Sequence, residues 1–445
     1  MSSITHPRLG FDELRPPLGA EEAVLEADRC LECGGPHAPA PCAVACPAGV
    51  DVARFIAEVA AGEPDAAAAT IFAENLLGGT CARVCPVEVL CEGACVLEHE
   101  GRRPIAIGAL QRYATEHFFE QKLPIRRSAP ENGRLVVVIG AGPSGLACAG
   151  ELASRGYAVT VYDRREEIGG LVRYAIAPYR QVRDPLPDEA RALEELGVEL
   201  RLGHQIASRE ELEAVSAEAD AVFLGVGLGP DTAISYPGDD LPGVWESLVF
   251  IEALKTGRPP VVGRRVVVIG GGNTAIDVAR EAIRLDAEEV TLVYRRGEAE
   301  LPAYPHEVEE AREEGVHFQF LTLPVRFLGR ERVEAVECRP MTLGETDESG
   351  RRRPVPLEGA DFTLPADTVV TAIGQQARSE LADWIDGLEL DDRGAVRIDP
   401  ETGRTGNPKF FAGGDAINGG ASVVEAVRDA KRAAKAIDGW VRCRS

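Results

Sequence analysis

Eight of the eleven cysteines crowd into one short stretch near the start of the chain, between Cys30 and Cys95. The first pair has C-x-x-C spacing and the next three pairs have C-x-x-x-C spacing, and both Cys46 and Cys85 precede a proline. Thiolates clustered in this way bind zinc or iron–sulfur clusters, and the Cys-Pro step is a feature of ferredoxin-type cluster binding. The chain therefore carries a candidate metal centre in its first quarter.

Three uses of these cysteines remain open from the residues alone. Zinc ribbons place paired C-x-x-C knuckles on short β-hairpins, whereas these cysteines are flanked by alanine-rich segments that predict helices near residues 21, 52–77 and 108–119. Iron–sulfur binding is therefore favoured over zinc, and structural disulfides come last. Eight thiolates would suffice for two four-iron clusters, which is the simplest count.

A second chemistry-bearing pattern begins at the apolar run Leu135–Ile139, which ends at Gly140. Gly142 and Gly145 follow with G-x-G-x-x-G spacing, and a helical pattern then begins. Such a strand, turn and helix bring backbone N–H groups and the positive end of a helix dipole to a pyrophosphate. The next apolar run, Ala158–Tyr162, ends at Asp163, whose carboxylate can accept hydrogen bonds from an adenosine ribose. The order of these elements predicts a dinucleotide site.

The same pattern returns in the second half of the chain with a different ending. An apolar strand at 265–269 leads into a glycine turn that reads G-x-G-x-x-A from Gly270 to Ala275, and a helix follows over 275–285. The next strand, 289–294, is followed by Arg295 and Arg296 instead of an acid. Arginines pair with a 2′-phosphate, which an acid would repel, so this turn is predicted to bind NADPH in preference to NADH. The alternative is that both arginines are solvated surface charge.

Other segments are expected to support these two turns. Apolar strands at 220–227 and 367–374 each end in glycine, and a third at 409–415 ends in Gly413-Gly414-Asp415; such glycine ends let backbone lie close to a cofactor. A final helix is predicted over 422–437, and strands with polar turns over 316–364. The helical segment within 301–315 is predicted to expose a solvated face made of five glutamates: Glu307, Glu309, Glu310, Glu313 and Glu314.

Composition narrows the functional classes. The chain has 445 residues, enough for two or three domains, and its formal net charge of −24 disfavours nucleic-acid and anionic-membrane partners. No apolar run reaches the length of a membrane span, and the first residues lack the core of a signal peptide, so we expect a cytoplasmic protein without a membrane partner. Residues 1–20 are rich in proline and are predicted to form an extended arm.

From Cys30 onward, the sequence resembles a family of pyridine-nucleotide flavoproteins. The motifs GAGPSGL, GGLVRY, GVG, GGGNTAID, TAIG and FAGGD follow the cysteine array in the family's order. This family contains the small subunit of bacterial glutamate synthase and the amino-terminal half of dihydropyrimidine dehydrogenase. The resemblance covers nearly the whole chain.

The resemblance implies an α/β fold in which a helical domain with two iron–sulfur clusters precedes two Rossmann-like dinucleotide-binding domains. The expected boundaries are 1–125 for the iron–sulfur domain, 126–262 and 365–445 for the two parts of the FAD domain, and 263–364 for the NADPH domain inserted in it. A proline-rich linker at 124–133 fits the first of these boundaries.

Cofactor roles also follow from the resemblance. It assigns FAD to the first glycine turn, with Asp163 on the ribose and Asp415 on the ribityl chain, and it directs the helix that starts near Ser422 toward the flavin ring. No catalytic side chain is expected, because hydride transfer is carried by the cofactors. The residues expected to line the FAD and NADPH sites are Gly140, Gly142, Pro143, Ser144, Gly145, Asp163, Gly170, Arg173, Arg180, Gly227, Gly270, Gly272, Asn273, Thr274, Ala275, Arg295, Arg296, Gly374, Gly414, Asp415 and Ser422.

The cluster ligands interleave in the dihydropyrimidine dehydrogenase branch, which LLGGTCARVCP, LCEGAC and IGALQRY resemble in detail. By that resemblance the first cluster would be held by Cys30, Cys33, Cys42 and Cys95. The second would be held by Cys46, Cys85, Cys91 and the side-chain oxygen of Gln111. Cys81 would then be a bystander, contrary to the count of eight thiolates. Glutamate synthase small subunits tend to carry Glu at the position of Gln111, so this residue points to the other branch.

The sequence departs from the family at two places. The loop between Cys33 and Cys42, GGPHAPAP, is longer than is usual in the family. Pro302 occupies the place where the dihydropyrimidine dehydrogenase branch has a further arginine for the NADPH phosphate.

Together these features predict an electron-input subunit that oxidises NADPH and passes electrons through FAD and two [4Fe-4S] clusters. The expected partner in a hetero-oligomer is the large subunit of a glutamate synthase or the barrel subunit of a dihydropyrimidine dehydrogenase. Another NADPH-linked iron–sulfur complex is a further alternative, and so is a non-catalytic scaffold that binds zinc and a nucleotide. No C-x-x-C lies in the flavin or nucleotide segments, which argues against a disulfide reductase of the thioredoxin reductase type.

Overall fold

The structure is a computed structural model that describes residues 9–35, 38–232, 234–346 and 350–443. The chain forms two compact units. Unit 1 comprises residues 1–13, 177–182 and 230–376, and unit 2 comprises 14–176, 183–229 and 377–445. Residues 1–8 of the predicted arm and residues 36 and 37 of the long cysteine loop lie outside the described residues; residues 15–19 form neither helix nor strand.

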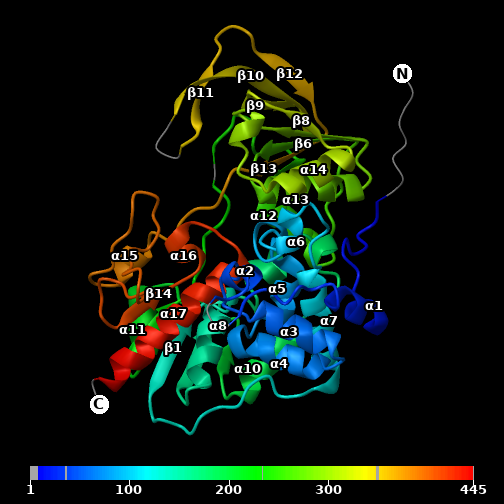
Figure 1. Ribbon diagram of the computed structural model, residues 1–445. Helices are drawn as coiled ribbons and strands as arrows, with labels where there is room; N and C mark the ends of the chain where they lie inside the picture. The colour runs from blue at the N-terminus through cyan, green and yellow to red at the C-terminus, as the bar shows by residue number, and fades with distance from the viewer. Residues whose placement is uncertain (1–8, 36–37, 233, 347–349, 444–445) are drawn as a thin grey trace. The chain divides into compact units, whose positions relative to one another are not determined.

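Unit 2 begins with a group of helices, most of them short, in the segment that contains the clustered cysteines (Figure 1, blue). They are α1 (Ala20–Ala27), α2 (Pro41–Val44), α3 (Val52–Ala60), α4 (Pro64–Glu74), α5 (Gly78–Val84), the 3₁₀ turn η1 (Val87–Val89), α6 (Val96–His99) and α7 (Ile107–Gln121). The stretch 52–77 is not one helix as the alanine-rich pattern suggests. Gly62 adopts a positive φ of 76°, and Pro64 starts a new helix, so the chain turns back and α4 packs against α3 and α7.

A five-stranded parallel sheet follows in unit 2, in the order β14-β4-β1-β2-β3. Its strands are β1 (Leu135–Ile139), β2 (Ala158–Tyr162), β3 (Glu199–Arg201), β4 (Ala221–Leu224) and β14 (Phe410–Ala412). Parallel strands buried on both faces read as continuous apolar runs, as the first two strands do. The helices of this part are α8 (Pro143–Ala153), α9 (Leu171–Tyr174), α10 (Leu186–Glu195), α11 (Arg209–Ser216), α15 (Leu381–Trp384), α16 (Asp415–Asn418) and α17 (Val423–Arg442).

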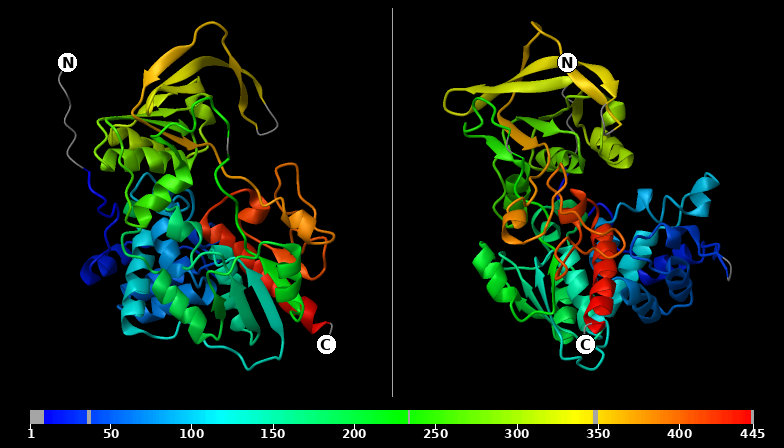
Figure 2. Two further views of the ribbon diagram at one scale, coloured as in Figure 1. Left: turned by 180° about the vertical axis from the view of Figure 1, so that it is seen from behind. Right: turned by 90° about the vertical axis from the view of Figure 1, so that its left-hand side faces the viewer.

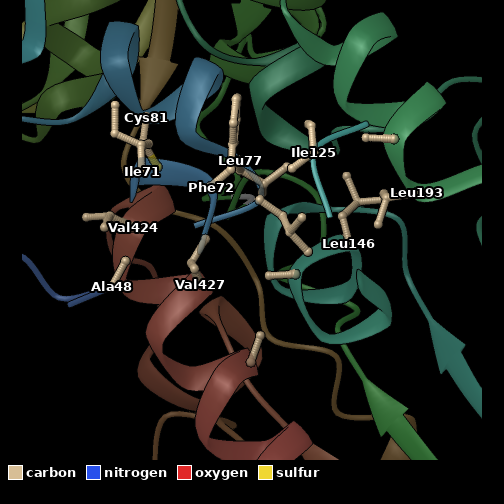
Figure 3. Close-up of a cluster of buried hydrophobic side chains, with 14 of the residues drawn as sticks. Ala48, Ile71, Phe72, Leu77, Cys81, Ile125, Leu146, Leu193, Val424 and Val427 are labelled. Atoms are coloured by element: carbon tan, nitrogen blue, oxygen red, sulfur yellow. The ribbon is translucent and has the colours of Figure 1, made fainter. Parts of the chain in front are cut away.

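One hydrophobic core joins the cysteine-bearing helices to this sheet. Figure 3 shows Phe72 of α4 and Leu77, just before α5, beside Leu146 of α8 and Val427 of α17, and all of these side chains are at most 1 % exposed. A Cβ atom added at Gly150 of α8 would overlap the side chain of Leu76, so the two helical layers pack too closely for a larger residue there. The cysteine-bearing segment and the first parallel sheet with its helices therefore form one packed body.

Polar contacts reinforce this joint. Both the N–H and the hydroxyl of Thr80 donate to the buried carboxylate of Glu189, at 2.8 and 2.6 Å. Helix α17 lies between the sheet and the amino-terminal helices (Figure 2, right), and its Lys431 donates to the carbonyl oxygens of Ala48 and Glu74 at 2.7 and 2.8 Å. The long carboxy-terminal helix is thus tied to the segment that carries the cysteines.

Unit 1 contains a second five-stranded parallel sheet, in the order β5-β13-β6-β7-β8. Its strands are β5 (Val244–Glu246), β6 (Arg265–Gly270), β7 (Glu289–Val293), β8 (His317–Gln319) and β13 (Thr368–Ala372). The helical segments are η2 (Pro178–Arg180), α12 (Ser247–Lys255), α13 (Asn273–Arg284), η3 (Glu298–Glu300) and α14 (Pro305–Glu313). Both sheets place the strand before the glycine turn at the centre, as in Rossmann-type folds, which confirms the predicted fold class.

An antiparallel ribbon completes unit 1 (Figure 1, yellow). It consists of β9 (Thr322–Gly329), β10 (Val333–Thr346), β11 (Arg352–Pro356) and β12 (Phe362–Pro365), with β10 paired to the other three. The strands predicted over 316–364 are therefore present. Because β5 and β13 share a sheet with β6, unit 1 is wider than the segment 263–364; the cofactor-domain boundaries stay a prediction.

The expectation of a solvated glutamate face in the segment 301–315 is wrong for three of the five glutamates. Glu309 and Glu313 are exposed, but Glu307 is only 5 % exposed. Glu310 and Glu314 bind the guanidinium of Arg280, which is 1 % exposed and lies on α13. The acids were misread because their basic partners are more than twenty residues away in the sequence. Among the described residues, no helix is both long and apolar enough to cross a bilayer.

Candidate functional site

Four cysteines line one small cavity in unit 2. Cys30, Cys33, Cys42 and Cys95 surround it together with apolar side chains that include Ile56. Burial and, to a smaller extent, the neighbouring thiols of Cys30 and Cys95 together raise the pKa of Cys42 to about 11. The structure thus brings together the four residues expected at the first cluster.

A second set of thiols lies beside the first. Burial raises the pKa of Cys46, with a smaller contribution from Cys81, and it raises the pKa of Cys91, with contributions from Cys46 and Cys42. A hydrogen bond with Cys81 raises the pKa of Cys85, and burial and the nearby Cys91 add to it. These thiols therefore lie close together, and Cys42 connects them to the first set.

Cys81 lies beside the second set, and Gln111 contacts the helix that carries Cys81, so the structure leaves the fourth ligand open. The side-chain amide of Gln111 donates from Nε2 to the carbonyl oxygen of Gly78 at 2.8 Å, at the start of the helix that carries Cys81. This bond directs the amide nitrogen toward the backbone and leaves its oxygen available. The ligand roles of Gln111 and of the seven predicted cysteines stay a prediction.

The donor set fits an iron–sulfur centre. All eleven cysteines are free thiols. Thiolates are the usual ligands of four-iron clusters, and apolar surroundings such as those of the cavity tune their potential. Within the described residues, no three His, Cys, Asp or Glu side chains converge tightly enough to hold a single metal ion.

The first glycine turn forms a cradle that has no room for side chains. Gly140 adopts a φ of 107°, and a Cβ atom there would overlap the carbonyl oxygen of Gly225 at the end of β4. A Cβ atom at Gly145 would overlap the carbonyl oxygen of Gly140. The turn, helix α8 and strand β4 therefore approach one another at backbone distance, as a pyrophosphate site requires.

Two further predicted segments meet this turn. Gly170 has a φ of 53°, and its Cβ atom would lie 3.0 Å from the Cα of Gly142. Gly414, at the end of β14, would place a Cβ atom 2.9 Å from the Cβ of Ser144. The hydroxyl of Ser144 is buried and has no hydrogen-bond partner among the described residues. An unpartnered donor at the first turn of α8, which Pro143 begins, fits a site that binds an anion.

Asp163 follows β2 directly and is held by backbone. Its carboxylate accepts from the N–H of Ala141 at 2.7 Å and from the N–H of Arg165 at 2.8 Å. The acid therefore lies at the tip of the second strand, beside the glycine turn, where a ribose would bind.

Asp415 lies just beyond β14 and begins α16. Its carboxylate accepts from the N–H of Ala421 at 3.1 Å, while burial, and to a smaller extent Glu425 and Asp429, raise its pKa. Ser422 precedes α17, and its N–H and hydroxyl both donate to Glu425. The start of α17 is therefore capped within unit 2.

The two arginines expected near FAD differ in their surroundings. Arg173 of α9 pairs with Glu167 in unit 2. Arg180 belongs to unit 1, where its guanidinium binds the carboxylates of Asp277 and Glu307 at 2.6 and 3.0 Å. The role of Arg180 at FAD stays a prediction, but its charge is already paired in the nucleotide fold of unit 1.

The second glycine turn repeats the cradle in unit 1 with two changes. A Cβ atom at Gly270 would overlap the carbonyl oxygen of Ala372 on β13, whereas Gly272 faces open space. The helix-packing position holds Ala275, which is fully buried. Asn273 accepts from the N–H of Tyr304 at 2.9 Å and so ties the turn to the loop before α14, and Thr274 follows it in α13.

The tip of the second strand differs from the prediction by one residue. Strand β7 ends at Val293, so Tyr294 occupies the place that Asp163 has after β2. The Tyr294 hydroxyl donates to the carbonyl oxygen of Glu300 at 2.8 Å. Arg295 is exposed, whereas Arg296 is 7 % exposed and donates from Nε to the carbonyl oxygen of Arg352 at 3.0 Å. Arg296 is therefore not a solvated surface charge.

Some contributors were not found from the sequence. Gly225 makes the close approach to the first turn, whereas the predicted Gly227 has a φ of 61° and no near neighbour. Gly374 also has a positive φ, of 110°. Gly225 is the first glycine of the GVG motif, so the sequence could have indicated it. Nothing local marked Lys431, which contacts the cysteine segment from a helix more than 300 residues later.

Family models match most of the chain. The pyridine nucleotide-disulphide oxidoreductase model matches residues 102–249 and 134–430. A second model, dihydropyrimidine dehydrogenase domain II, 4Fe-4S cluster, matches residues 8–123, the segment that carries the eight clustered cysteines.

Curated relatives and solved structures agree with these models. The chain is 38% identical to the glutamate synthase [NADPH] small chain of Halomonas elongata, over 96% of this chain and 92% of that one. It is 37% identical to the NADP(+)-dependent formate dehydrogenase subunit beta of Moorella thermoacetica, over 92% of this chain but only 60% of that longer protein. FprA from Mycobacterium tuberculosis, solved with NADPH, has the same fold over 71% of this chain and 85% of FprA, with a TM-score of 0.60 and 21% identity.

Paired nucleotide folds and a cysteine-lined cavity thus occur in a chain that matches a glutamate synthase small chain almost end to end. The chain belongs to the glutamate synthase small-chain family of NADPH-dependent FAD and iron–sulfur oxidoreductases.

Proposed function

We propose that this protein is the electron-input subunit of a larger enzyme, with NADPH bound in unit 1 and FAD and two [4Fe-4S] clusters in unit 2. When bound, these groups supply hydride transfer from NADPH to the flavin and one-electron transfer from the flavin onward. The observation that carries the proposal is the single core that joins the cysteine sets to the first glycine turn. Electron transfer between two centres needs a fixed separation, which a continuous core provides.

The residues of unit 1 would bind and orient NADPH. The backbone of Gly270 and Gly272 and the first turn of α13 would hold its pyrophosphate, with Arg295 and Arg296 on the 2′-phosphate. Thr274 and Gly374 complete the predicted surroundings. Support comes from the open space at Gly272 and from the cationic strand tip.

The residues of unit 2 would bind FAD in the cradle between α8 and β4. Asp163 would accept from the ribose and Asp415 from the ribityl chain, and the start of α17 after Ser422 would stabilise negative charge on the reduced ring. The unpartnered hydroxyl of Ser144 supports the placement of the pyrophosphate.

Anaerobic purification of the full chain tests the cofactor content directly. We expect FAD and about eight irons per chain, the number that two four-iron clusters require. A colourless protein that contains zinc would instead favour the scaffold alternative. Iron near half the expected value, with FAD intact, would contradict only the second cluster.

The proposal includes a partner subunit, which we infer from the names of two relatives. The Halomonas protein is a small chain and the Moorella protein is a subunit beta, so each is one subunit of a larger enzyme. We propose the large subunit of a glutamate synthase as the partner, because the match to such a small chain spans almost both lengths. A cytoplasmic location is part of the same proposal.

Mass spectrometry of what co-purifies with the tagged protein from its native host tests the partner. A large amidotransferase–synthase subunit would support the glutamate synthase assignment and would overrule the indication from Gln111. A flavin barrel with ferredoxin-like cysteines would replace it with dihydropyrimidine dehydrogenase. A formate dehydrogenase subunit would show that the chain serves a third kind of complex.

A further inference from the structure

The antiparallel ribbon of unit 1 reaches the strand tip where the 2′-phosphate of NADPH is proposed to bind. The first residue of β11, Arg352, accepts at its carbonyl oxygen from Nε of Arg296, at 3.0 Å. A Cβ atom at Gly297 would lie 3.4 Å from the side chain of Leu343 on β10. Two strands of the ribbon therefore approach Arg296 and Gly297, the second and third residues after Tyr294.

The side chain of Arg352 is held in a defined direction. Its Nε donates to Oε1 of Glu300 at 2.8 Å, and the Glu300 side chain is only 6 % exposed. The Arg352 side chain itself is 54 % exposed. Its two terminal nitrogens bind no partner among the residues that the structure describes. An acid thus fixes one edge of the guanidinium and leaves the other edge available.

Glu300 is well suited to act as an anchor. The segment around it is tight, because the Tyr294 hydroxyl binds its carbonyl oxygen and a Cβ atom at Gly297 would lie 2.8 Å from its Oε2. That Oε2 is buried and lacks a hydrogen-bond partner among the described residues. A buried carboxylate needs a cation nearby, and Arg352 is the cation that it binds.

The strand tip itself supplies only two arginines, Arg295 and the largely buried Arg296. A phosphate dianion is best recognised by several guanidinium groups that each offer two parallel N–H donors. The ribbon brings such a group to the same place from a segment more than fifty residues later.

We propose that Arg352 is a specificity-determining residue that binds the 2′-phosphate of NADPH together with Arg295, and that Glu300 orients it. This inference rests on the proposed function, since it needs the nucleotide to lie in the glycine turn of unit 1. It adds the antiparallel ribbon to the nucleotide site as an element that selects NADPH over NADH.

Binding of 2′,5′-ADP and of 5′-AMP to the holoprotein, measured by calorimetry, tests the proposal. In Arg352→Ala we expect the dissociation constant of 2′,5′-ADP to rise about tenfold or more, as for loss of a charge-assisted hydrogen bond, with that of 5′-AMP unchanged. The ratio of kcat/KM for NADPH to that for NADH should fall by a similar factor. Arg352→Lys should recover only part of the loss, because an ammonium cannot bind Glu300 and a phosphate with one fixed plane.

Arg353→Ala is the matched control. It removes the same charge from the next residue of β11, whose side chain points to the opposite face of the ribbon, and it should leave both dissociation constants unchanged. An equal loss in Arg353→Ala would mean that general surface charge is being measured, and it would overturn the proposal.

A second comparison separates this inference from the proposed function. If Arg295→Ala weakens 2′,5′-ADP and Arg352→Ala does not, the role of Arg352 is wrong while the nucleotide site stands. If neither variant changes binding, NADPH does not bind at this strand tip, and both statements fail. Melting temperatures equal to that of the wild type ensure that each variant is folded.

Discussion

The two glycine turns of this protein approach their neighbouring strands in a similar way, but the residues after the second strand carry opposite charges. Each follows a central parallel strand, and in each a Cβ atom at the first glycine would overlap a carbonyl oxygen of the neighbouring strand, from Gly225 in unit 2 and from Ala372 in unit 1. After the second strand, however, unit 2 places Asp163, and unit 1 places Tyr294 followed by Arg295. In the proposed account, either cradle would hold a pyrophosphate, and the residues at the strand tip would select the nucleotide that carries it.

A second difference lies where the helix packs on the turn. Gly145 leaves no room for a Cβ atom, whereas Ala275 already carries one in the equivalent place. The turn of unit 1 therefore accommodates one methyl group that the turn of unit 2 excludes. The comparison teaches that glycine at the third position is required only where the packing is tightest.

The largest effect is expected from closing the tighter cradle. Gly145→Ala would push the new Cβ atom into the Gly140 carbonyl oxygen and displace the turn, so we expect flavin content to fall to a small fraction of the wild-type value. Released flavin after gel filtration measures this. The matched change in unit 1, Ala275→Gly, removes a methyl group without overlap and should leave flavin content intact. Full flavin occupancy in Gly145→Ala would show that the first turn does not hold FAD.

Asp415 has no acidic counterpart at Gly374, the glycine end of β13 in unit 1. Asp415→Ala should therefore weaken FAD, by about tenfold or more for a lost charged hydrogen bond, without changing the affinity for 2′,5′-ADP. Fluorescence titration of flavin-depleted protein with FAD gives the dissociation constant. An unchanged constant would remove Asp415 from the flavin site.

Reversal of the charge at Arg295 would give the strand tip of unit 1 an acid, as Asp163 gives the strand tip of unit 2. Arg295→Glu should reduce the preference for NADPH over NADH by about a hundredfold, since an attraction is replaced by repulsion of the 2′-phosphate. Steady-state kcat/KM values for both nucleotides measure the preference. An unaltered ratio would place the phosphate contact elsewhere on the protein.

The buried ion pairs behind the second turn are expected to make the stability of unit 1 sensitive to acid. Burial alone would raise the pKa of Glu314, but hydrogen bonds from Arg284 and Arg280 outweigh it and lower the pKa to about 2. The stabilisation is present above the unfolded pKa of about 4.3 and is lost as the pH falls through the folded pKa. Glu314→Gln should therefore reduce the free energy of unfolding by about 3 kcal/mol at pH 7 and much less near pH 2.

The smallest effect is expected from the exposed neighbour of Glu314. Glu313→Gln should change the free energy of unfolding by less than about 0.5 kcal/mol at either pH. Urea unfolding of both variants at the two pH values measures the difference. Equal losses in the two variants would mean that the ion pairs with Arg280 and Arg284 do not stabilise the fold.

The elements that could be predicted from the sequence are those that a short stretch of neighbouring residues determines. The strands Leu135–Ile139 and Ala158–Tyr162 have the predicted bounds, because a buried parallel strand reads as an apolar run between turn residues. Four of the cysteines that the family resemblance groups, Cys30, Cys33, Cys42 and Cys95, line one cavity, and their roles as cluster ligands stay a prediction.

The rest depends on partners that are remote in the sequence. The burial of Glu307 requires Arg180, and the contact of Arg296 with Arg352 requires a ribbon whose path no local pattern reveals. The prediction of one helix over 52–77 was wrong for a different reason. Gly62 and Pro64 indicate a break between α3 and α4, but the prediction was based on the alanine content of the segment. Ion pairs and ribbon contacts lie beyond what spacing alone can predict.

The central claim is that the turn of unit 1 binds NADPH, that the turn of unit 2 binds FAD, and that NADPH passes a hydride to FAD. Rapid mixing of the anaerobic holoprotein, without a partner, with one equivalent of NADPH or NADH tests it most directly, with flavin absorbance as the signal. We predict that NADPH bleaches the flavin in a single turnover and that NADH does so much more slowly at the same concentration. A flavin that NADPH leaves oxidised, or that NADH reduces equally fast, would contradict the account.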